Sequence, residues 1–156
     1  MQVTLPVILT FLAAASNGLL AGASLDQSLK QLPARHRMGV SAFSLYSRSA
    51  DLSPNGIVWY ALLGISAALV TLAAAVATDI SGSTQTLPIL GAAVLSVLHS
   101  IATSFAAPTN FRQRKVLKDE AALAAVFDTF ERWQTVRVIL QVSTFMLTLW
   151  AIVVLG

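Results

Sequence analysis

Long apolar runs alternate with short polar segments along this chain of 156 residues. No Asp, Glu, Lys or Arg occurs in three of the runs, which cover residues 3–25, 55–78 and 87–107. A fourth run covers residues 134–155 and contains a single charge, Arg137. A helix needs about 20 apolar residues to cross the ~30 Å hydrocarbon core of a bilayer. We therefore predict an all-α polytopic membrane protein in which these four runs form a four-transmembrane-helix bundle.

The charges between the runs orient the predicted helices. All Lys and Arg residues except Arg137 fall in two connections, residues 26–54 and 108–133, and none falls in residues 79–86. Basic connections stay on the cytoplasmic side of a membrane. We therefore expect residues 1–156 to form one integral membrane domain with both termini on the non-cytoplasmic side. The alternative, a cleaved secretion signal ending near residues 21–23, would require basic residues at the N-terminus, and residues 1–4 have none.

Composition supports the membrane assignment and narrows the partners. Hydrophobic residues make up 56% of the chain and charged residues 11%, against about 25% charged in ordinary soluble domains. The net charge of +3 does not indicate a nucleic-acid partner, because the basic residues lie in the two connections or at the edge of the fourth run. We expect membrane lipid, including anionic headgroups, as the partner of these residues. No cysteine is present, which excludes disulfides, thiolate nucleophiles and cysteine-ligated metals.

Proline and polar residues predict where the helices begin and end. Pro33 is expected to end the first helix, and Ser53 with Pro54 is typical of an N-cap and first-turn proline opening the second. Residues 81–86 predict a tight turn between the second and third helices. Residues 113–155 contain neither Pro nor Gly, so they could form one long helix or two helices joined by a bend.

The segment before the fourth run is amphipathic. Its apolar residues recur at helical spacing, at Val116, Leu123, Phe127 and Phe130. This pattern predicts a helical extension that lies on the membrane surface or packs against the loop of residues 32–52, and the alternative is a helix that binds a partner protein.

Small residues form a stripe on the first run, at Ala14, Gly18 and Gly22. Such stripes let helix backbones approach closely in lipid. The stripe could pack inside the bundle or form a homo-oligomer interface with a second copy of the chain.

Polar residues inside the runs are the strongest indication of a functional site, because polar groups are costly in a bilayer. Counting from the basic end of each run at 1.5 Å per residue places Asn17, His99 and Gln141 at one level, roughly 11 Å inside the boundary. Tyr60 and Arg137 fall about one turn nearer the boundary. The matching depths predict a polar cavity between the helices that opens toward the cytoplasm.

His99 is the residue of this group best suited to chemistry. An apolar surrounding would keep its imidazole neutral and able to accept a proton as a general base. The alternatives are a purely structural histidine hydrogen-bonded across helices and an axial haem ligand. A protein-bound metal is not expected, since the only other histidine, His36, lies in a connection. We expect no cofactor, with haem as the alternative.

Arg137 and Asn17 each allow two interpretations. Arg137 could extend to the lipid headgroups or face inward and bind an anionic oxygen, with Asn110 and Trp133 completing a polar and aromatic rim. Asn17 fits an interhelical hydrogen bond as well as a ligand contact. Three acidic residues fit helix caps or surface charges: Asp26, Asp51 and Asp79. No hydrolase motif is present in the sequence.

The chain resembles the anthrone oxygenase-like family of small four-helix integral membrane proteins. The resemblance rests on Pro108, Thr109 and Asn110 after a polar-faced third span, and on Trp133 and Arg137 at the opening of the fourth. The general plan of spans and connections agrees over nearly the whole length. The family often has leucine three residues after the asparagine, where this chain has a glutamine.

This resemblance implies a cofactor-independent oxidation of a flat phenolic anthrone to its quinone by molecular oxygen. His99 would be the catalytic base, and Arg137 with Asn110 or Gln141 would stabilise the developing oxyanion. The remaining substrate-binding residues would be Asn17, Tyr60 and Trp133. The expected ligand is a hydrophobic aromatic small molecule. The alternative functions are a non-enzymatic membrane scaffold and a subunit that binds lipid or a small amphiphile.

Overall fold

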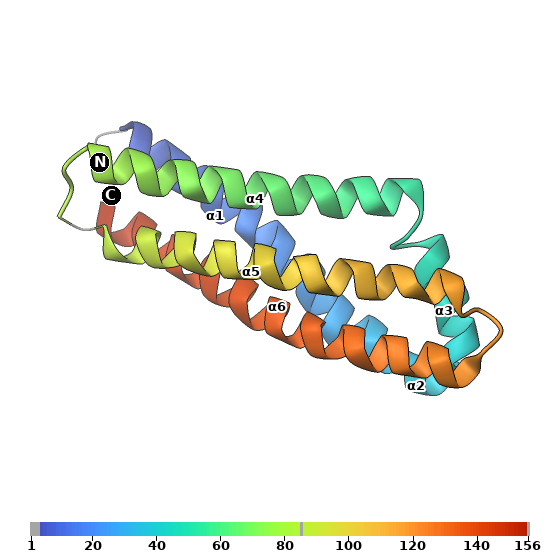
Figure 1. The fold of residues 1–156 in the computed structure, drawn as a ribbon. Helices are drawn as coiled ribbons and strands as arrows, with labels where there is room; N and C mark the ends of the chain where they lie inside the picture. Colours follow the sequence, from blue (N-terminus) through green and yellow to red (C-terminus); the bar gives the residue numbers. More distant parts are fainter. Residues whose placement is uncertain (1–3, 85, 156) are drawn as a thin grey trace.

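The computed structural model describes residues 4–84 and 86–155 as a bundle of long helices (Figure 1). Four segments are long and apolar enough to cross a membrane. They are built on α1 (Leu5–Asp26), α4 (Pro54–Ile80), α5 (Leu87–Phe111) and α6 (Glu120–Leu155). The described residues contain no strand. The chain is thus an all-α integral membrane protein with a four-helix bundle, as predicted.

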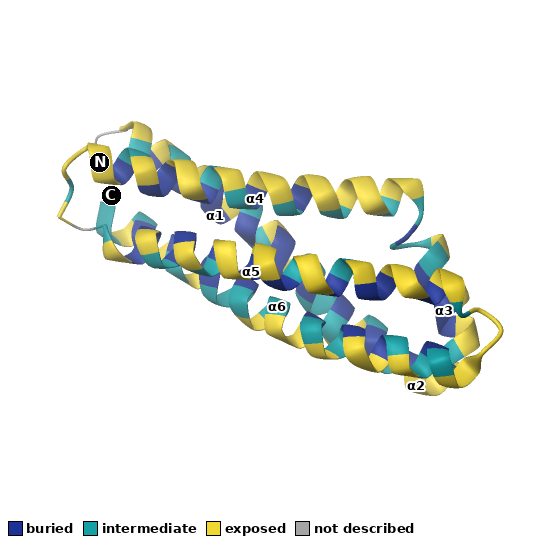
Figure 2. Cartoon of the chain, in the orientation of Figure 1, coloured by how far each residue is buried: buried dark blue, intermediate teal, exposed yellow. Residues whose placement is uncertain are grey.

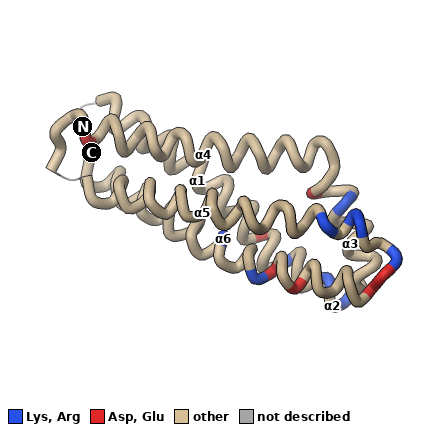
Figure 3. Tube along the Cα trace, viewed as in Figure 1, with Lys and Arg blue, Asp and Glu red and all other residues tan. Residues whose placement is uncertain are grey.

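Shorter elements gather at one end of the bundle, which we call the basic end. They are the π-helical segment η1 (Gln27–Gln31), α2 (Leu32–Met38), α3 (Val40–Ser49) and the 3-10 segment η2 (Arg112–Lys115). Figure 3 shows that most Lys, Arg, Asp and Glu residues also lie at this end. The beginning of α1 and the end of α6 lie together at the other end (Figure 1), which we call the terminal end.

The first helix does not stop at Pro33 as expected. It widens into η1 and continues through α2 to Met38. Pro33 falls in the first turn of α2, where a missing N–H leaves no hydrogen bond broken. The wider π-turn before Pro33 lets the chain resume an α-helix there, so the helical segment continues without a break. The chain then turns at Gly39, a glycine with φ of +84°.

The third and fourth helices also differ from the predicted boundaries. The predicted span of residues 87–107 continues through Pro108 to Phe111, since a proline removes one helical hydrogen bond without preventing the next turns from forming. The fourth helix begins at Glu120, because Asp119 Oδ1 accepts a hydrogen bond from the Ala122 N–H at 2.9 Å and caps the helix. From there α6 runs unbroken for 36 residues. The predicted stretch of residues 113–155 is therefore one helix from Glu120 onward, while residues 113–115 belong to η2 and residues 116–119 are not helical.

Ser53 and Pro54 open α4 as predicted. The Ser53 hydroxyl oxygen accepts a hydrogen bond from the Gly56 N–H at 3.1 Å, and Pro54 lies in the first turn. Gly56 is required by close packing, because a Cβ there would collide with the Ala50 carbonyl oxygen and lie 2.7 Å from the Asp51 carbonyl oxygen.

Small residues hold the terminal end together. A buried cluster of mainly alanines joins all four long helices: Ala13, Ala74, Ala75, Ile89, Ala92, Ala93 and Ala151. Part of the predicted stripe on α1 also packs inside the bundle, because Ala14 is buried and Gly18 lies beneath the Phe145 ring of α6. Gly22 is exposed, with no atom near its missing Cβ. Small side chains therefore allow close helix contact here, while the outer faces of the bundle are exposed (Figure 2).

Bulky residues form the core of the basic end. Phe43 of α3 packs edge-on against Phe127 of α6, with ring centroids 5.0 Å apart. The other buried members of the cluster are Leu32, Ala106, Leu123 and Phe130. The predicted amphipathic face of α6 therefore packs against the loop helices.

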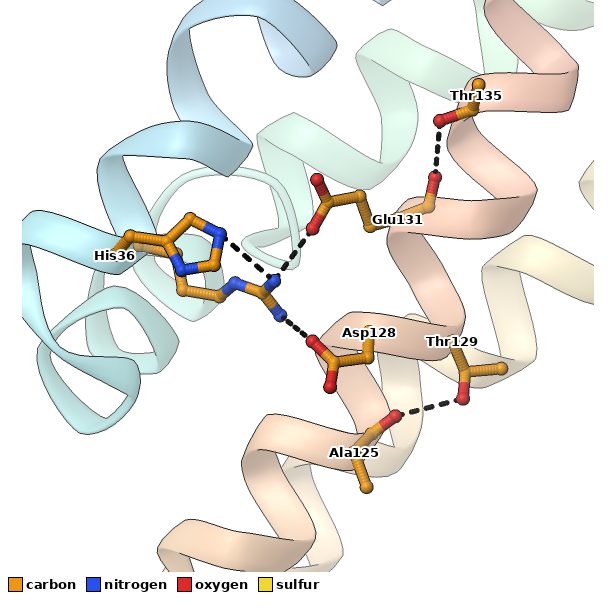
Figure 4. A network of polar contacts seen from close by, with 7 residues as sticks. His36, Ala125, Asp128, Thr129, Glu131 and Thr135 are labelled. Carbon is orange, nitrogen blue, oxygen red and sulfur yellow. Dashed lines mark hydrogen bonds and ion pairs between the residues drawn. The ribbon is translucent and has the colours of Figure 1, made fainter.

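Arg35 adds a charged link between α2 and α6; its partners Asp128 and Glu131 are labelled in Figure 4. Its guanidinium is nearly buried and donates to Asp128 Oδ1 at 2.9 Å and to Glu131 Oε2 at 2.7 Å. One cation thus joins two carboxylates on successive turns of α6, which fixes the position of the loop helices on the bundle.

Helix packing is uneven around the bundle. Close contact is extensive between α5 and α6, between α1 and α4, and between α1 and α6, but it is sparse between α4 and α5. The half of α4 nearest the basic end is held mainly by a small cluster in which Leu63 and Ala67 pack on Leu20 of α1. Space therefore remains between α4 and α5.

Candidate functional site

A cavity of about 550 Å³ occupies the space between α4 and α5. Most of its lining is apolar. Its polar residues come from η1, from the loop before α4 and from α4, α5 and α6: Gln27, Asp51, Tyr60, His99, Ser100, Thr103, Asn110 and Arg137. Lining residues such as Ile65 and Leu69 of α4 and Ser100 of α5 are also exposed on the outer surface of the bundle. The cavity is therefore open sideways between α4 and α5, where a hydrophobic molecule in the bilayer could enter.

His99 lies in the cavity wall with an unused hydrogen-bonding atom. The side chain is 5% exposed, and its Nε2 atom has no hydrogen-bond partner. Three other buried atoms share this property within the described chain, but they belong to Ser28, Gln31 and Arg35 at the basic end. A buried polar atom without a partner is costly, so His99 has an unsatisfied nitrogen in a side chain that lines the cavity.

Arg137 of α6 points across to α5, next to His99. Its Nε donates to Thr103 Oγ1 at 3.0 Å, and its Nη1 donates to Gln134 Oε1 at 2.7 Å. Thr103 lies one turn beyond His99 and donates to the His99 carbonyl oxygen at 2.9 Å. The guanidinium is thus held inside the bundle rather than extended to the headgroups. Arg137 lines the cavity, and its Nη2 makes no hydrogen bond within the described residues.

A second polar group lies at the basic end of the cavity. Gln27 Nε2 donates to Asp51 Oδ2 at 3.3 Å, and the Tyr60 hydroxyl donates to Asp51 Oδ1 at 3.5 Å. Burial raises the pKa of the Asp51 carboxyl, while hydrogen bonds from Gln27, Tyr60 and Ser47 act in the opposite direction. Burial exceeds these hydrogen bonds, so the carboxyl is poorly stabilised in its charged form.

Asn110 closes the same region from the end of α5. Its Oδ1 accepts a hydrogen bond from Gln113 Nε2 at 2.7 Å, and Gln113 also contacts Ser44 and Ser47 of α3. These bonds fix the Asn110 side chain, whose amide nitrogen donates to none of the described residues. Asn110 therefore offers a donor to the cavity.

Three of the predicted site residues lie away from the cavity. Asn17 Nδ2 donates to Thr71 Oγ1 at 2.7 Å, and Gln141 Nε2 donates to Asn17 Oδ1 at 2.9 Å, so these residues join α1, α4 and α6. Trp133 stacks on Phe105 with ring centroids 4.9 Å apart, and neither ring lines the cavity. The structure thus brings His99, Arg137, Tyr60 and Asn110 around one cavity and places Asn17, Gln141 and Trp133 elsewhere.

Asp51 and Gln27 were not predicted as site residues. The sequence favoured a cap or surface charge for Asp51, because it lies beside a helix start. The direction in which the Asp51 side chain points depends on the tight turn that packs the Asp51 carbonyl against Gly56. The direction of the Gln27 side chain depends on the π-helical segment η1. Neither feature has a clear signal in the sequence, although Gln27 is the second residue after the first apolar run, directly after Asp26.

The fold and the cavity define an integral membrane protein with a ligand-sized space between its helices. Residues 4–84 and 86–155 contain no group of three His, Cys, Asp or Glu side chains that could hold a metal ion. Comparisons of the chain with protein-family models, with curated proteins and with solved structures found no match.

Proposed function

We propose that this protein binds a flat, hydrophobic phenol of the anthrone type between α4 and α5 and oxidises it with molecular oxygen, without a cofactor. The observation that carries the proposal is the unpaired Nε2 of buried His99 in an apolar cavity, with the guanidinium of Arg137 one turn away. A base beside a fixed cation is the arrangement that proton removal from a weak carbon acid requires. The choice of reaction comes from the resemblance to the anthrone oxygenase-like family around Asn110, Trp133 and Arg137.

The reaction begins with removal of a proton from the methylene carbon of the anthrone by His99 Nε2. The resulting anion is delocalised onto the former ketone oxygen, where Arg137 and the Asn110 amide stabilise the negative charge. The electron-rich carbon then reacts with oxygen to form a peroxide, and loss of water gives the quinone. One anthrone and one O₂ yield one anthraquinone and one water, so the substrate supplies all the electrons.

The cavity supplies binding as well as chemistry. Its apolar lining and lateral opening suit a substrate dissolved in the bilayer. Rings that line the cavity include Tyr60, Phe111 and Phe130, and these can pack on a flat aromatic ligand. Asn17 and Gln141 would act by holding α1 against α6, and Trp133 by packing on Phe105.

The test is oxidation of anthrone by purified protein in detergent, with oxygen and no added cofactor. Quinone formation is followed by absorbance against a blank of buffer and detergent. A general base contributes about 10²- to 10⁴-fold to a rate, so His99→Ala should lower the rate above blank by about 100-fold or more. Leu98→Ala is the matched control, because Leu98 is the neighbouring residue on α5 and faces outward.

Equal rates for protein and blank would overturn the proposal. Equal losses for His99→Ala and Leu98→Ala would also contradict the role of His99. The visible absorbance spectrum of the same purified protein tests the haem alternative, because bound haem would colour the protein.

A second candidate is binding of a lipid or small amphiphile without turnover. The lateral opening and apolar lining of the cavity favour it, since both would serve binding alone. This candidate predicts that anthrone binds with measurable affinity while wild-type and His99→Ala proteins produce quinone only at the rate of the blank.

A further inference from the structure

Asp51 is a carboxyl group without a strong partner at the basic end of the cavity. It lines the cavity from the turn between α3 and α4. The donors from Gln27 and Tyr60 stand 3.3 and 3.5 Å from its oxygens, which is longer than good hydrogen bonds of these types, and Ser47 contributes less than either. Asp51 takes part in no ion pair within the described residues. The carboxyl therefore has capacity for a closer donor.

The backbone fixes this carboxyl in place. The Leu52 N–H donates to the Ser47 carbonyl oxygen at 3.0 Å, and Arg114 Nη2 donates to the Leu52 carbonyl oxygen at 2.6 Å. The carbonyl of Asp51 packs so closely on Gly56 that no side chain would fit between them. Asp51 is thus preorganised before a ligand arrives, which reduces the entropy lost on binding.

We propose that Asp51 recognises the substrate by accepting a hydrogen bond from a ring hydroxyl on the side of the molecule away from the reacting carbon. This inference rests on the proposed function, because it assigns the second polar contact of the same ligand. His99 would hold the reacting carbon, Arg137 would hold the ketone oxygen across the central ring, and Asp51 would hold the hydroxyl at the basic end.

The surrounding charges favour a neutral hydroxyl over a cationic amine as this donor. An ammonium group would be repelled by the Arg137 guanidinium, which lines the same cavity. It would also be repelled by Arg114, which donates a hydrogen bond to the carbonyl oxygen of Leu52, the residue after Asp51. A neutral phenol avoids this repulsion and dissolves in the bilayer from which the cavity opens. The preferred substrate is therefore a flat phenol with a hydroxyl on an outer ring, away from the reacting carbon.

The test compares two probes that differ by one hydroxyl, 2-hydroxyanthrone and anthrone. Their dissociation constants are measured under argon, so that no oxidation occurs. The wild-type protein should bind 2-hydroxyanthrone about tenfold more tightly, as expected for one hydrogen bond to a carboxylate. Asp51→Ala should abolish this preference while leaving anthrone binding in place. Asp79→Ala is the matched control, because Asp79 is exposed and lies near the terminal end.

The outcomes separate this inference from the proposed function. An unchanged preference in Asp51→Ala, or an equal loss of affinity for both probes, overturns the role of Asp51 while anthrone oxidation by the wild type stands. Binding of neither probe to the wild type overturns both. Asp51→Asn keeps the size of the side chain and serves if Asp51→Ala does not fold; its weaker acceptor should reduce the preference several-fold, and an unchanged preference overturns the inference.

Discussion

Two polar clusters lie one turn apart along α6, and they differ in whether their hydrogen bonds are complete. In the first, Asn17 donates to Thr71 and accepts from Gln141, so its amide is fully used. In the second, Arg137 is bound to Thr103, but His99 beside it keeps an unpaired nitrogen. The first cluster joins three helices and leaves nothing for a ligand, whereas the second faces a cavity.

This difference teaches that depth in the membrane alone does not identify a functional residue. Both clusters carry the polar groups that a bilayer makes costly. Interhelical hydrogen bonding offsets that cost for Asn17 and Gln141. His99 Nε2 has no such partner within the described residues, and this is why our proposal places ligand binding at the second cluster.

The largest effect expected from this comparison is on the rate, at Arg137. Arg137→Lys keeps a positive charge but removes the planar guanidinium, which can bind Thr103 and a ligand in the cavity at the same time. Loss of one group that stabilises an oxyanion lowers a rate by about 100-fold or more, so anthrone oxidation should fall by about that factor. Arg132→Lys is the control, because Arg132 is an exposed arginine of the same helix. Equal rates for the two variants would contradict the assignment.

A smaller effect, on stability, is expected at Asn17. Asn17→Ala removes hydrogen bonds to α4 and α6, and hydrogen bonds between membrane helices contribute about 0.6 to 1.7 kcal/mol each. The free energy of unfolding, measured by denaturant titration in mixed micelles, should fall by about 1–2 kcal/mol. His99→Ala should change it less, since no hydrogen bond to Nε2 is lost. A larger loss of stability in His99→Ala than in Asn17→Ala would reverse our comparison.

The smallest expected effect is on how stability depends on pH, through Asp51. This residue extends the comparison to the basic end of the cavity. Because burial raises the pKa of Asp51 above its ordinary 3.8, the folded protein holds this proton more tightly than the unfolded chain. The contribution of Asp51 to stability is therefore present at low pH and is lost as pH rises through the raised pKa. Asp51→Asn stays neutral, so it should be more stable than the wild type at neutral pH, by less than about 1 kcal/mol because solvent screens a half-buried charge.

Unfolding at acidic and neutral pH measures this effect. The difference in stability between wild type and Asp51→Asn should shrink in acid. A constant difference across this range would show that the Asp51 carboxyl carries no penalty for burial.

The sequence predicted the helices well because their signal is local. Runs of apolar residues of the right length gave all four spans, and Ser53 with Pro54 gave the start of α4. The sequence failed at Pro33 and Pro108, where the bundle holds the chain helical and overrides the local preference of proline. The start of α6 was missed because its cap at Asp119 resembles any other polar residue in a long helical pattern.

The site was predicted less completely, for a geometric reason. Counting residues gives a depth along each helix, but it does not give the direction in which a side chain points between neighbours. Asn17, His99 and Gln141 were expected at one level around one cavity. The structure joins Asn17 to Gln141 and turns His99 to another space, because α1 packs on α4 and α6 while α5 packs mainly on α6. That order of neighbours depends on the whole fold.

The uninterrupted length of α6 has a mechanical consequence. At 1.5 Å per residue its 36 residues measure about 54 Å, well beyond the ~30 Å of hydrocarbon. With no proline or glycine to act as a joint, the helix is a stiff lever with Arg137 close to its midpoint. A force applied to the protruding arm would tilt the embedded arm as well, and the guanidinium would move with it.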